Sequence, residues 1–232
     1  MLPWVPLATA QLADGGVLRL KRRGAEFSIM LGSNELMNSR LSGSEKALAS
    51  LSLATFASHA APFVLIGGLG MGFTLRAALQ ELGPGAGVVV AELVPEVISW
   101  ARGPMADLFG NCLDDPRVRI SQADVADLIR AASTGHHDQT REGPIWDAIL
   151  LDVDNGPDGL TQSANDWLYS PAGLATAHAS LRTGGVLGVW SAHPDAGFRC
   201  RMAQAGFSVT EHKVRANGSG GGAKHIIWLG RR

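Results

Sequence analysis

The stretch FVLIGGLGMGFTLRAAL, residues 63–79, joins a short apolar run to four glycines within six positions and then to an amphipathic segment. A strand that runs into a glycine-rich turn and a helix is typical of nucleotide-binding units in parallel sheets. Glycine permits the tight turn and removes the Cβ atoms that would hold a ligand away from the backbone. The stretch therefore predicts a nucleotide site at Gly67, Gly68, Gly70 and Gly72.

Strands and helices alternate after this unit. The apolar runs predict strands at 63–67, 88–92, 117–121, 147–152, 185–190, 207–214 and 224–230. Between them, helical composition predicts helices at 72–82, 94–102, 124–132, 171–181 and 195–205. Apolar strands separated by helices favour an α/β fold with a doubly wound, mostly parallel sheet covered on both faces.

The region before Pro62 has a different pattern. Residues 17–31 alternate apolar and polar side chains around Arg23-Gly24, which predicts a β-hairpin. Residues 44–60 have helical composition, and Ser44 suits the N-cap of that helix. We therefore expect a small N-terminal hairpin region at 1–43 and a cofactor-binding domain at 44–232.

Acidic residues stand at the ends of three of these strands. Glu92 follows Gly68 by 24 positions, where a carboxylate can accept hydrogen bonds from both hydroxyls of a ribose. Asp124 could contact an adenine ring, and it could equally cap the helix that follows. Asp152 and Asp154 end a further strand. Because parallel strands end at one sheet edge, we expect these acids to share a crevice with the glycines.

Composition limits the classes of partner. The chain has 232 residues, 46% of them hydrophobic, and a formal net charge of −1, which gives no electrostatic reason to bind nucleic acid or an anionic membrane. Two cysteines, Cys112 and Cys200, fit a reducing cytoplasm, and no apolar run approaches the roughly 20 residues of a membrane span. His136 and His137 lie in a polar loop, where we expect solvated side chains and no metal.

The order of these motifs resembles the class I S-adenosylmethionine-dependent methyltransferases, and more narrowly the spermidine synthase group of aminopropyltransferases. The similarity runs through five segments: VLIGGLGMGFTLRAAL (64–79), VVVAELVPEVISWAR (88–102), RVRISQADVADLIR (117–130), WDAILLDVDNGP (146–157) and LYSPAGLATAHASLRTGGVLGVWS (168–191). It implies a Rossmann-like domain, S-adenosylmethionine or its decarboxylated form as cofactor, and a homodimer.

The resemblance also implies roles for individual residues. Cofactor contacts fall on the loop glycines and on Glu92, Leu93, Ala123, Asp124 and Asp152. Asp152 and Asp154 match the catalytic segment, and Asp152 is the candidate base for an attacking amine. Glu45 and Asn155 match substrate-facing positions, while Trp167 and Tyr169 follow the acidic loop and could wall an acceptor pocket. His193, after a late strand, is a further catalytic candidate.

Three departures shape the functional interpretation. Spermidine synthases carry an aspartate in the glycine loop, where this chain has Leu69 and Met71; Asn155 replaces a second aspartate, and Tyr169 is the sole tyrosine. We therefore interpret the chain as a small-molecule methyltransferase acting on an amine or hydroxyl. The alternatives are a polyamine aminopropyltransferase and a non-catalytic nucleoside-binding or interaction protein. A dehydrogenase fits poorly, because no second domain remains for its substrate.

Overall fold

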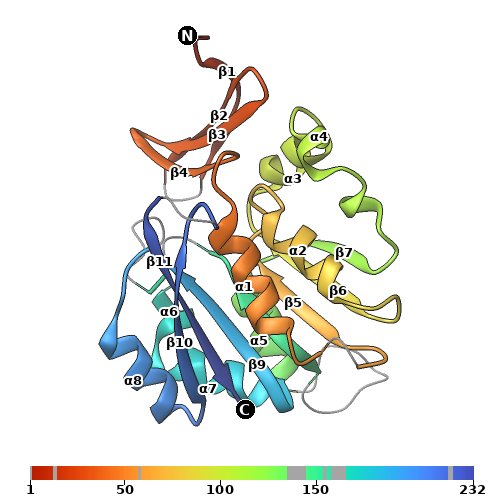
Figure 1. The fold of residues 1–232 in the computed structure, drawn as a ribbon, viewed down its shortest axis with the longest axis vertical. Coiled ribbons are helices and arrows are strands. Elements are labelled where there is room, and N and C mark those ends of the chain that lie inside the picture. The colour runs from red at the N-terminus through yellow and green to blue at the C-terminus, as the bar shows by residue number, and fades with distance from the viewer. Residues whose placement is uncertain are drawn as a thin grey trace.

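The computed structural model describes residues 2–12, 15–56, 59–134, 145–153, 156–157, 166–218 and 222–232. A seven-stranded sheet forms its centre, in the order β10-β11-β9-β8-β5-β6-β7 (Figure 1). The strands are β5 (Phe63–Gly67), β6 (Gly87–Glu92), β7 (Val118–Gln122), β8 (Trp146–Leu151), β9 (Leu181–Ser191), β10 (Ser208–Arg215) and β11 (Lys224–Arg231). Strand β11 is antiparallel to both neighbours, and the other pairs are parallel. The predicted doubly wound, mostly parallel sheet is confirmed.

Helices cover both faces of this sheet because its strands are apolar on both sides. In β5, Val64 and Ile66 join one buried cluster while Leu65 joins the other. The first cluster includes buried side chains of α1 (Gly43–Leu53), α2 (Phe73–Glu81) and α3 (Pro95–Arg102). The second includes those of α5 (Val125–Ser133), α7 (Pro171–Ser180) and α8 (Ala196–Gln204). Three short helices were not predicted: α4 (Ala106–Phe109), a 3₁₀ turn (Cys112–Asp114) and α6 (Asp166–Tyr169).

In the N-terminal region, the hairpin predicted at 17–31 is confirmed by the pairing of its two strands, and the region contains two further strands. The region forms a four-stranded antiparallel sheet of β1 (Val5–Gln11), β2 (Val17–Arg23), β3 (Glu26–Leu31) and β4 (Asn34–Asn38). Strand β1 escaped prediction because Pro6 argues against a strand, and its pairing with β2 is irregular between Pro6 and Ala8. Leu20 and Ile29 of this sheet belong to the first cluster of the α/β domain.

Helix α1 differs from its prediction at both ends. Its N-cap is Ser42, whereas Ser44 lies buried within the first turn and bonds side chains instead. The helix ends at Leu53 rather than at residue 60, and a turn follows in which the Phe56 amide donates to the Leu53 carbonyl (2.8 Å). Phe56 is buried in the first cluster, so the chain bends where this ring enters the core.

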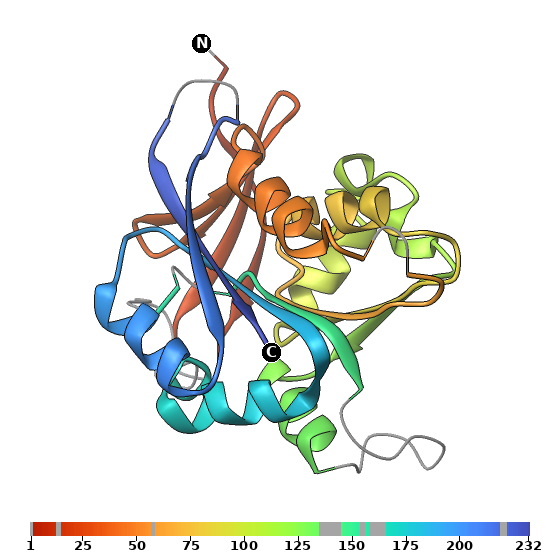
Figure 2. The ribbon, with the colours of Figure 1, turned by 60° about the horizontal axis from the view of Figure 1, so that its bottom comes forward.

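Two distant segments meet at the start of α1. The Gly43 amide donates to the carbonyl of Ala216, at the end of the β10–β11 hairpin (2.8 Å). Figures 1 and 2 show this hairpin running up beside α1 toward the N-terminal sheet. None of the helices that the structure describes has the length and apolar character needed to cross a bilayer.

Candidate functional site

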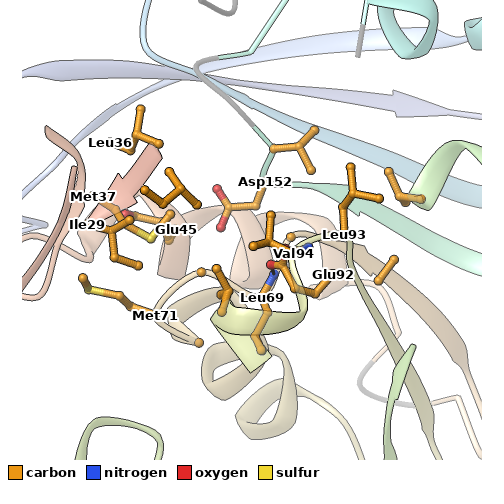
Figure 3. A pocket seen from close by; sticks show the side chains of 18 of the residues that line it. Ile29, Leu36, Met37, Glu45, Leu69, Met71, Glu92, Leu93, Val94 and Asp152 are labelled. Carbon is orange, nitrogen blue, oxygen red and sulfur yellow. Dashed lines mark hydrogen bonds between the residues drawn. The ribbon is translucent and has the colours of Figure 1, made fainter. Parts of the chain in front are cut away.

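A pocket lies between the carboxyl ends of the central strands and the N-terminal sheet (Figure 3). The strand order reverses at β5, with β6 on one side and β8 on the other, so the crevice forms where open α/β sheets bind ligands. Its described lining is Leu12, Leu18, Ile29, Leu36, Met37, Glu45, Gly68, Leu69, Gly70, Met71, Gly72, Phe73, Ala91, Glu92, Leu93, Val94, Val97, Ala123, Asp124, Val125, Asp152, Val153 and Trp190.

The glycine loop has a packing role as well as room for a ligand. Gly68 and Gly70 have φ values of +90° and +49°, which side chains rarely adopt. A Cβ at Gly68 would overlap the carbonyl oxygen of Asp152, and one at Gly70 would lie 3.1 Å from the sulfur of Met37. These glycines therefore let the end of β8 and strand β4 approach the loop. Gly67, which ends β5, does not appear in the pocket lining.

Glu92 is held at the pocket by backbone amides. Its Oε2 accepts from the Leu69 amide (3.1 Å) and its Oε1 from the Val94 amide (2.8 Å). Burial raises the pKa of this carboxyl, although the amide hydrogen bonds oppose the rise. Each carboxylate oxygen has a second lone pair, so Glu92 can still accept hydrogen bonds from a ligand's hydroxyls.

Asp124 takes the helix-capping role that the sequence allowed, and it also lies at the pocket. Its Oδ1 accepts from the Ala126 amide (2.8 Å), which caps α5. Asp124 also lines the pocket with its neighbour Ala123. The capping bond fixes the carboxylate at the pocket wall.

Asp152 and Glu45 form an acidic pair in the centre of Figure 3. The hydroxyl of Thr74 donates to Asp152 Oδ2 (2.6 Å). Burial raises the pKa of Asp152 to about 7; the negative charge of Glu45 adds to the rise, and the Thr74 hydrogen bond opposes it. Burial also raises the pKa of Glu45. A carboxyl that titrates near neutral pH can exchange protons with an amine.

A second set of hydrogen bonds orients Glu45. The hydroxyl of Ser44 donates to Glu45 Oε2 (2.7 Å), and His225 Nδ1 lies 2.9 Å from the same hydroxyl oxygen. Because the serine proton is directed to Glu45, Nδ1 of the imidazole is the donor in the second contact. Burial and the charge of His193 lower the pKa of His225, which favours the neutral ring. Strand β11 thus reaches the pocket through His225, Ser44 and Glu45.

The charged side chains in the described lining of the pocket are all acidic. Glu45, Glu92, Asp124 and Asp152 line it, and its described lining contains no lysine, arginine or histidine. Leu69 and Met71, the two non-glycine residues within the glycine loop, are buried and apolar. Such a site suits a cation whose charge the carboxylates can offset.

Several residues expected at the site lie elsewhere or cannot be placed. Tyr169 is buried in the second cluster, where its hydroxyl donates to the Val153 carbonyl (3.2 Å). The ring of Trp167 stacks under the guanidinium of Arg130, 3.7 Å from the ring centroid, and does not appear in the pocket lining. His193 is absent from the lining too. Asp154, Asn155, His136 and His137 fall outside the described residues.

Residues that hold the pocket side chains in place, and one residue of its wall, were not predicted. Thr74 and His225 bond partners 78 and 181 positions away, and such separations leave no sequence signal. Trp190 lines the pocket wall, and its indole nitrogen finds no acceptor among the described residues. The apolar side chains of the N-terminal sheet carried the ordinary alternation of a buried strand face, so their position over the glycine loop was not apparent.

Neither a protein-family model nor a curated protein matches the chain. Solved structures share its fold. A spermidine synthase in complex with the transition-state analogue AdoDATO has a TM-score of 0.71 at 18% identity, over 97% of this chain and 72% of that one. Spermidine synthase from Thermotoga maritima gives 0.72 at 18% identity over the same shares. A probable spermidine synthase from Corynebacterium glutamicum gives 0.59 at 17%, over 98% and 81%. The predicted spermidine synthase-like fold is confirmed.

Proposed function

We propose that the chain is an aminopropyltransferase that uses decarboxylated S-adenosylmethionine as donor and an amine as acceptor. The observation that carries the proposal is the charge of the pocket, whose described lining has four carboxylates and no basic side chain. The fold shared with spermidine synthases supports the same class of transfer. Aminopropyl transfer replaces the methyltransferase interpretation, because the structurally similar spermidine synthases support it better than methyl transfer.

The two candidate donors differ by one carboxylate. S-adenosylmethionine carries an α-carboxylate beside its ammonium and sulfonium, whereas the decarboxylated form carries the two positive charges alone. An anionic group near Asp152 and Glu45 would face like charge, and the described lining offers no lysine or arginine to pair with it. The buried Leu69 and Met71 also give it no hydrogen-bond partner from their side chains. The dicationic donor therefore fits better.

The nucleoside end of that donor would contact the glycine-loop side of the pocket. Glu92, held by two backbone amides, would accept hydrogen bonds from the ribose, and Ala123 and Asp124 follow the neighbouring strand. A sulfonium donor supplies an electrophilic carbon. The acceptor nitrogen forms a bond to this carbon while the carbon–sulfur bond breaks. The electron pair of the broken bond stays on sulfur, which becomes a neutral thioether.

Asp152 is the proposed base for this step. An amine attacks through its lone pair, so the proton that its nitrogen carries must be removed, and the Asp152 carboxylate receives it. A pKa near 7 leaves much of Asp152 ionised at neutral pH while keeping it basic enough to take the proton. Thr74 holds one carboxylate oxygen, and Glu45 provides a second negative charge for the ammonium form of the acceptor.

The direct test is product analysis. The protein is incubated with decarboxylated S-adenosylmethionine and a panel of primary amines, and mass spectrometry measures methylthioadenosine and aminopropylated amine. We expect both products, and Asp152→Asn should lower the rate by at least about 100-fold, in the range typical of a lost general base. Asp107→Asn, on the exposed surface of α4, is the matched control and should keep full activity. Methylated acceptor formed from S-adenosylmethionine, with no aminopropyl product, would refute the proposal.

A further inference from the structure

The end of the pocket beneath the N-terminal sheet is apolar. Five of its lining residues come from this region, and all five have hydrocarbon or thioether side chains: Leu12, Leu18, Ile29, Leu36 and Met37. Figure 3 shows Ile29, Leu36 and Met37 gathered on one side of Asp152, with Glu92, Leu93 and Val94 on the other. The pocket thus has an apolar end and a nucleoside end; Asp152 lies between them, and Glu45 lies beside it on the side of Ile29 and Met37.

The acidic residues of the N-terminal sheet are engaged away from this pocket. Glu35, which precedes Leu36, accepts from Ser28 Oγ (2.7 Å) and pairs with Arg40 (3.2 Å). Glu26 pairs with Arg23. Neither glutamate appears in the lining, so the described part of the sheet offers the pocket no carboxylate.

With the nucleoside of the donor at the end near Glu92, the apolar end is the part of the described pocket that remains for the acceptor. A second ammonium group extending toward Ile29 and Leu36 would lose its hydration with no described carboxylate from the sheet to replace it. A hydrocarbon chain in the same place gains by leaving water. The pocket therefore favours a charged group at the end of the acceptor near Asp152 and an apolar group at its other end.

Resting on the proposed function, we propose that the acceptor is a primary amine with one positive charge and an apolar body. Its nitrogen lies at Asp152 and Glu45, and its alkyl or aryl body lies against Leu36, Met37 and the neighbouring apolar side chains of the N-terminal sheet. The same enzyme would therefore discriminate against linear diamines, whose far end is charged.

Hexylamine and hexane-1,6-diamine test this proposal, because they have the same chain and differ in the distal ammonium. We expect kcat/KM for aminopropyl transfer to be at least about tenfold higher for hexylamine, because a buried, unpaired ammonium costs well over the free energy of one decade. Leu36→Asp places a carboxylate beside the expected chain and should reverse this preference. Leu7→Asp, on an exposed position of β1 outside the pocket lining, should leave it unchanged.

The outcomes separate the acceptor from the reaction. Equal rates, or a preference for the diamine, would overturn the apolar acceptor and leave the aminopropyltransferase function standing. If neither amine yields product, the proposed aminopropyl transfer to these amines is refuted. Calorimetry of both amines with methylthioadenosine-saturated protein then decides the acceptor class. Tighter binding of hexylamine, abolished in Leu36→Asp, supports the apolar site; equal or tighter binding of the diamine contradicts it.

Discussion

Asp152 has a pKa that its neighbours push in opposite directions. Burial and Glu45 raise it, and the Thr74 hydroxyl lowers it by donating to Oδ2 at 2.6 Å. A base that titrates near pH 7 makes turnover depend on pH in the range where the protein is readily handled. The residues around Asp152 therefore set the pH range of the proposed reaction.

Two substitutions should move the acid limb of the pH profile in opposite directions. Glu45→Gln removes a negative charge and lowers the pKa of Asp152, so kcat/KM should reach its plateau at lower pH than in the wild type. Thr74→Val removes a hydrogen bond to the ionised form and raises this pKa, so the plateau should begin at higher pH. Initial rates from pH 5 to 9, measured for both variants and the wild type, provide the comparison. Shifts in the same direction would show that another group titrates.

The hydrogen bonds from His225 to Ser44 and from Ser44 to Glu45 predict a positioning effect. Ser44→Ala leaves Glu45 without its donor and His225 without its acceptor, so we expect KM for the amine to rise about threefold to tenfold, as for one lost hydrogen bond. The Kd for decarboxylated S-adenosylmethionine should stay unchanged. His225→Ala should act similarly, and the double variant should add little beyond either, because both substitutions remove one connected set of contacts. Full additivity would show that the two residues act separately.

At the scale of elements, the glycine loop joins three parts of the molecule. Residues 67–72 end β5, contact the end of β8 at Gly68 and approach β4 at Gly70. A change in this loop therefore affects both the stability of the fold and the position of Asp152.

Gly68→Ala tests this connection. The positive φ alone should lower the free energy of unfolding by about 1–3 kcal/mol, and the overlap with the Asp152 carbonyl adds to that loss. Urea unfolding gives the measurement. Gly83→Ala is the matched control, since its Cβ would meet no heavy atom within 4 Å, and we expect a change within about 0.5 kcal/mol. Equal stability of the two variants would contradict the packing role of Gly68.

The elements differ in how well the sequence predicts them. Strand β5 and helix α2 were predicted to within about a residue because an apolar run, glycines and a helical segment follow one another in a short stretch. Strands β1 and β4 were missed, since one contains Pro6 and the other, NELMN, contains asparagine and glutamate, which are depleted in strands. Asp152 could be placed at a strand end, but its bond to Thr74 depends on tertiary packing between residues 78 positions apart.

At the scale of the whole molecule, the raised carboxyl pKa values link stability to pH. Asp152 takes up its proton more readily in the folded protein than in the unfolded chain, so the folded state binds more protons between about pH 4 and 7. This contribution to stability is complete below the unfolded pKa and is lost as the pH rises through about 7. Burial acts in the same direction on Glu45 and Glu92.

The ligand-free protein should therefore melt at a lower temperature as the pH rises from 5 to 8. Asp152→Asn removes an ionisable group from the pocket and should flatten this dependence. Differential scanning calorimetry in buffers of equal ionic strength measures both proteins, and Asp107→Asn controls for the loss of a surface charge. An unchanged slope in Asp152→Asn would mean that this carboxyl is not the group responsible.

The acidic pocket is the central feature of the account, because the proposed donor and the site of the reaction both follow from it. Isothermal titration calorimetry at pH 7.5 with decarboxylated S-adenosylmethionine and with S-adenosylmethionine compares two ligands that differ by one carboxylate. We expect the decarboxylated form to bind at least about tenfold more tightly, a difference of about 1.4 kcal/mol. Tighter binding of S-adenosylmethionine would contradict the account.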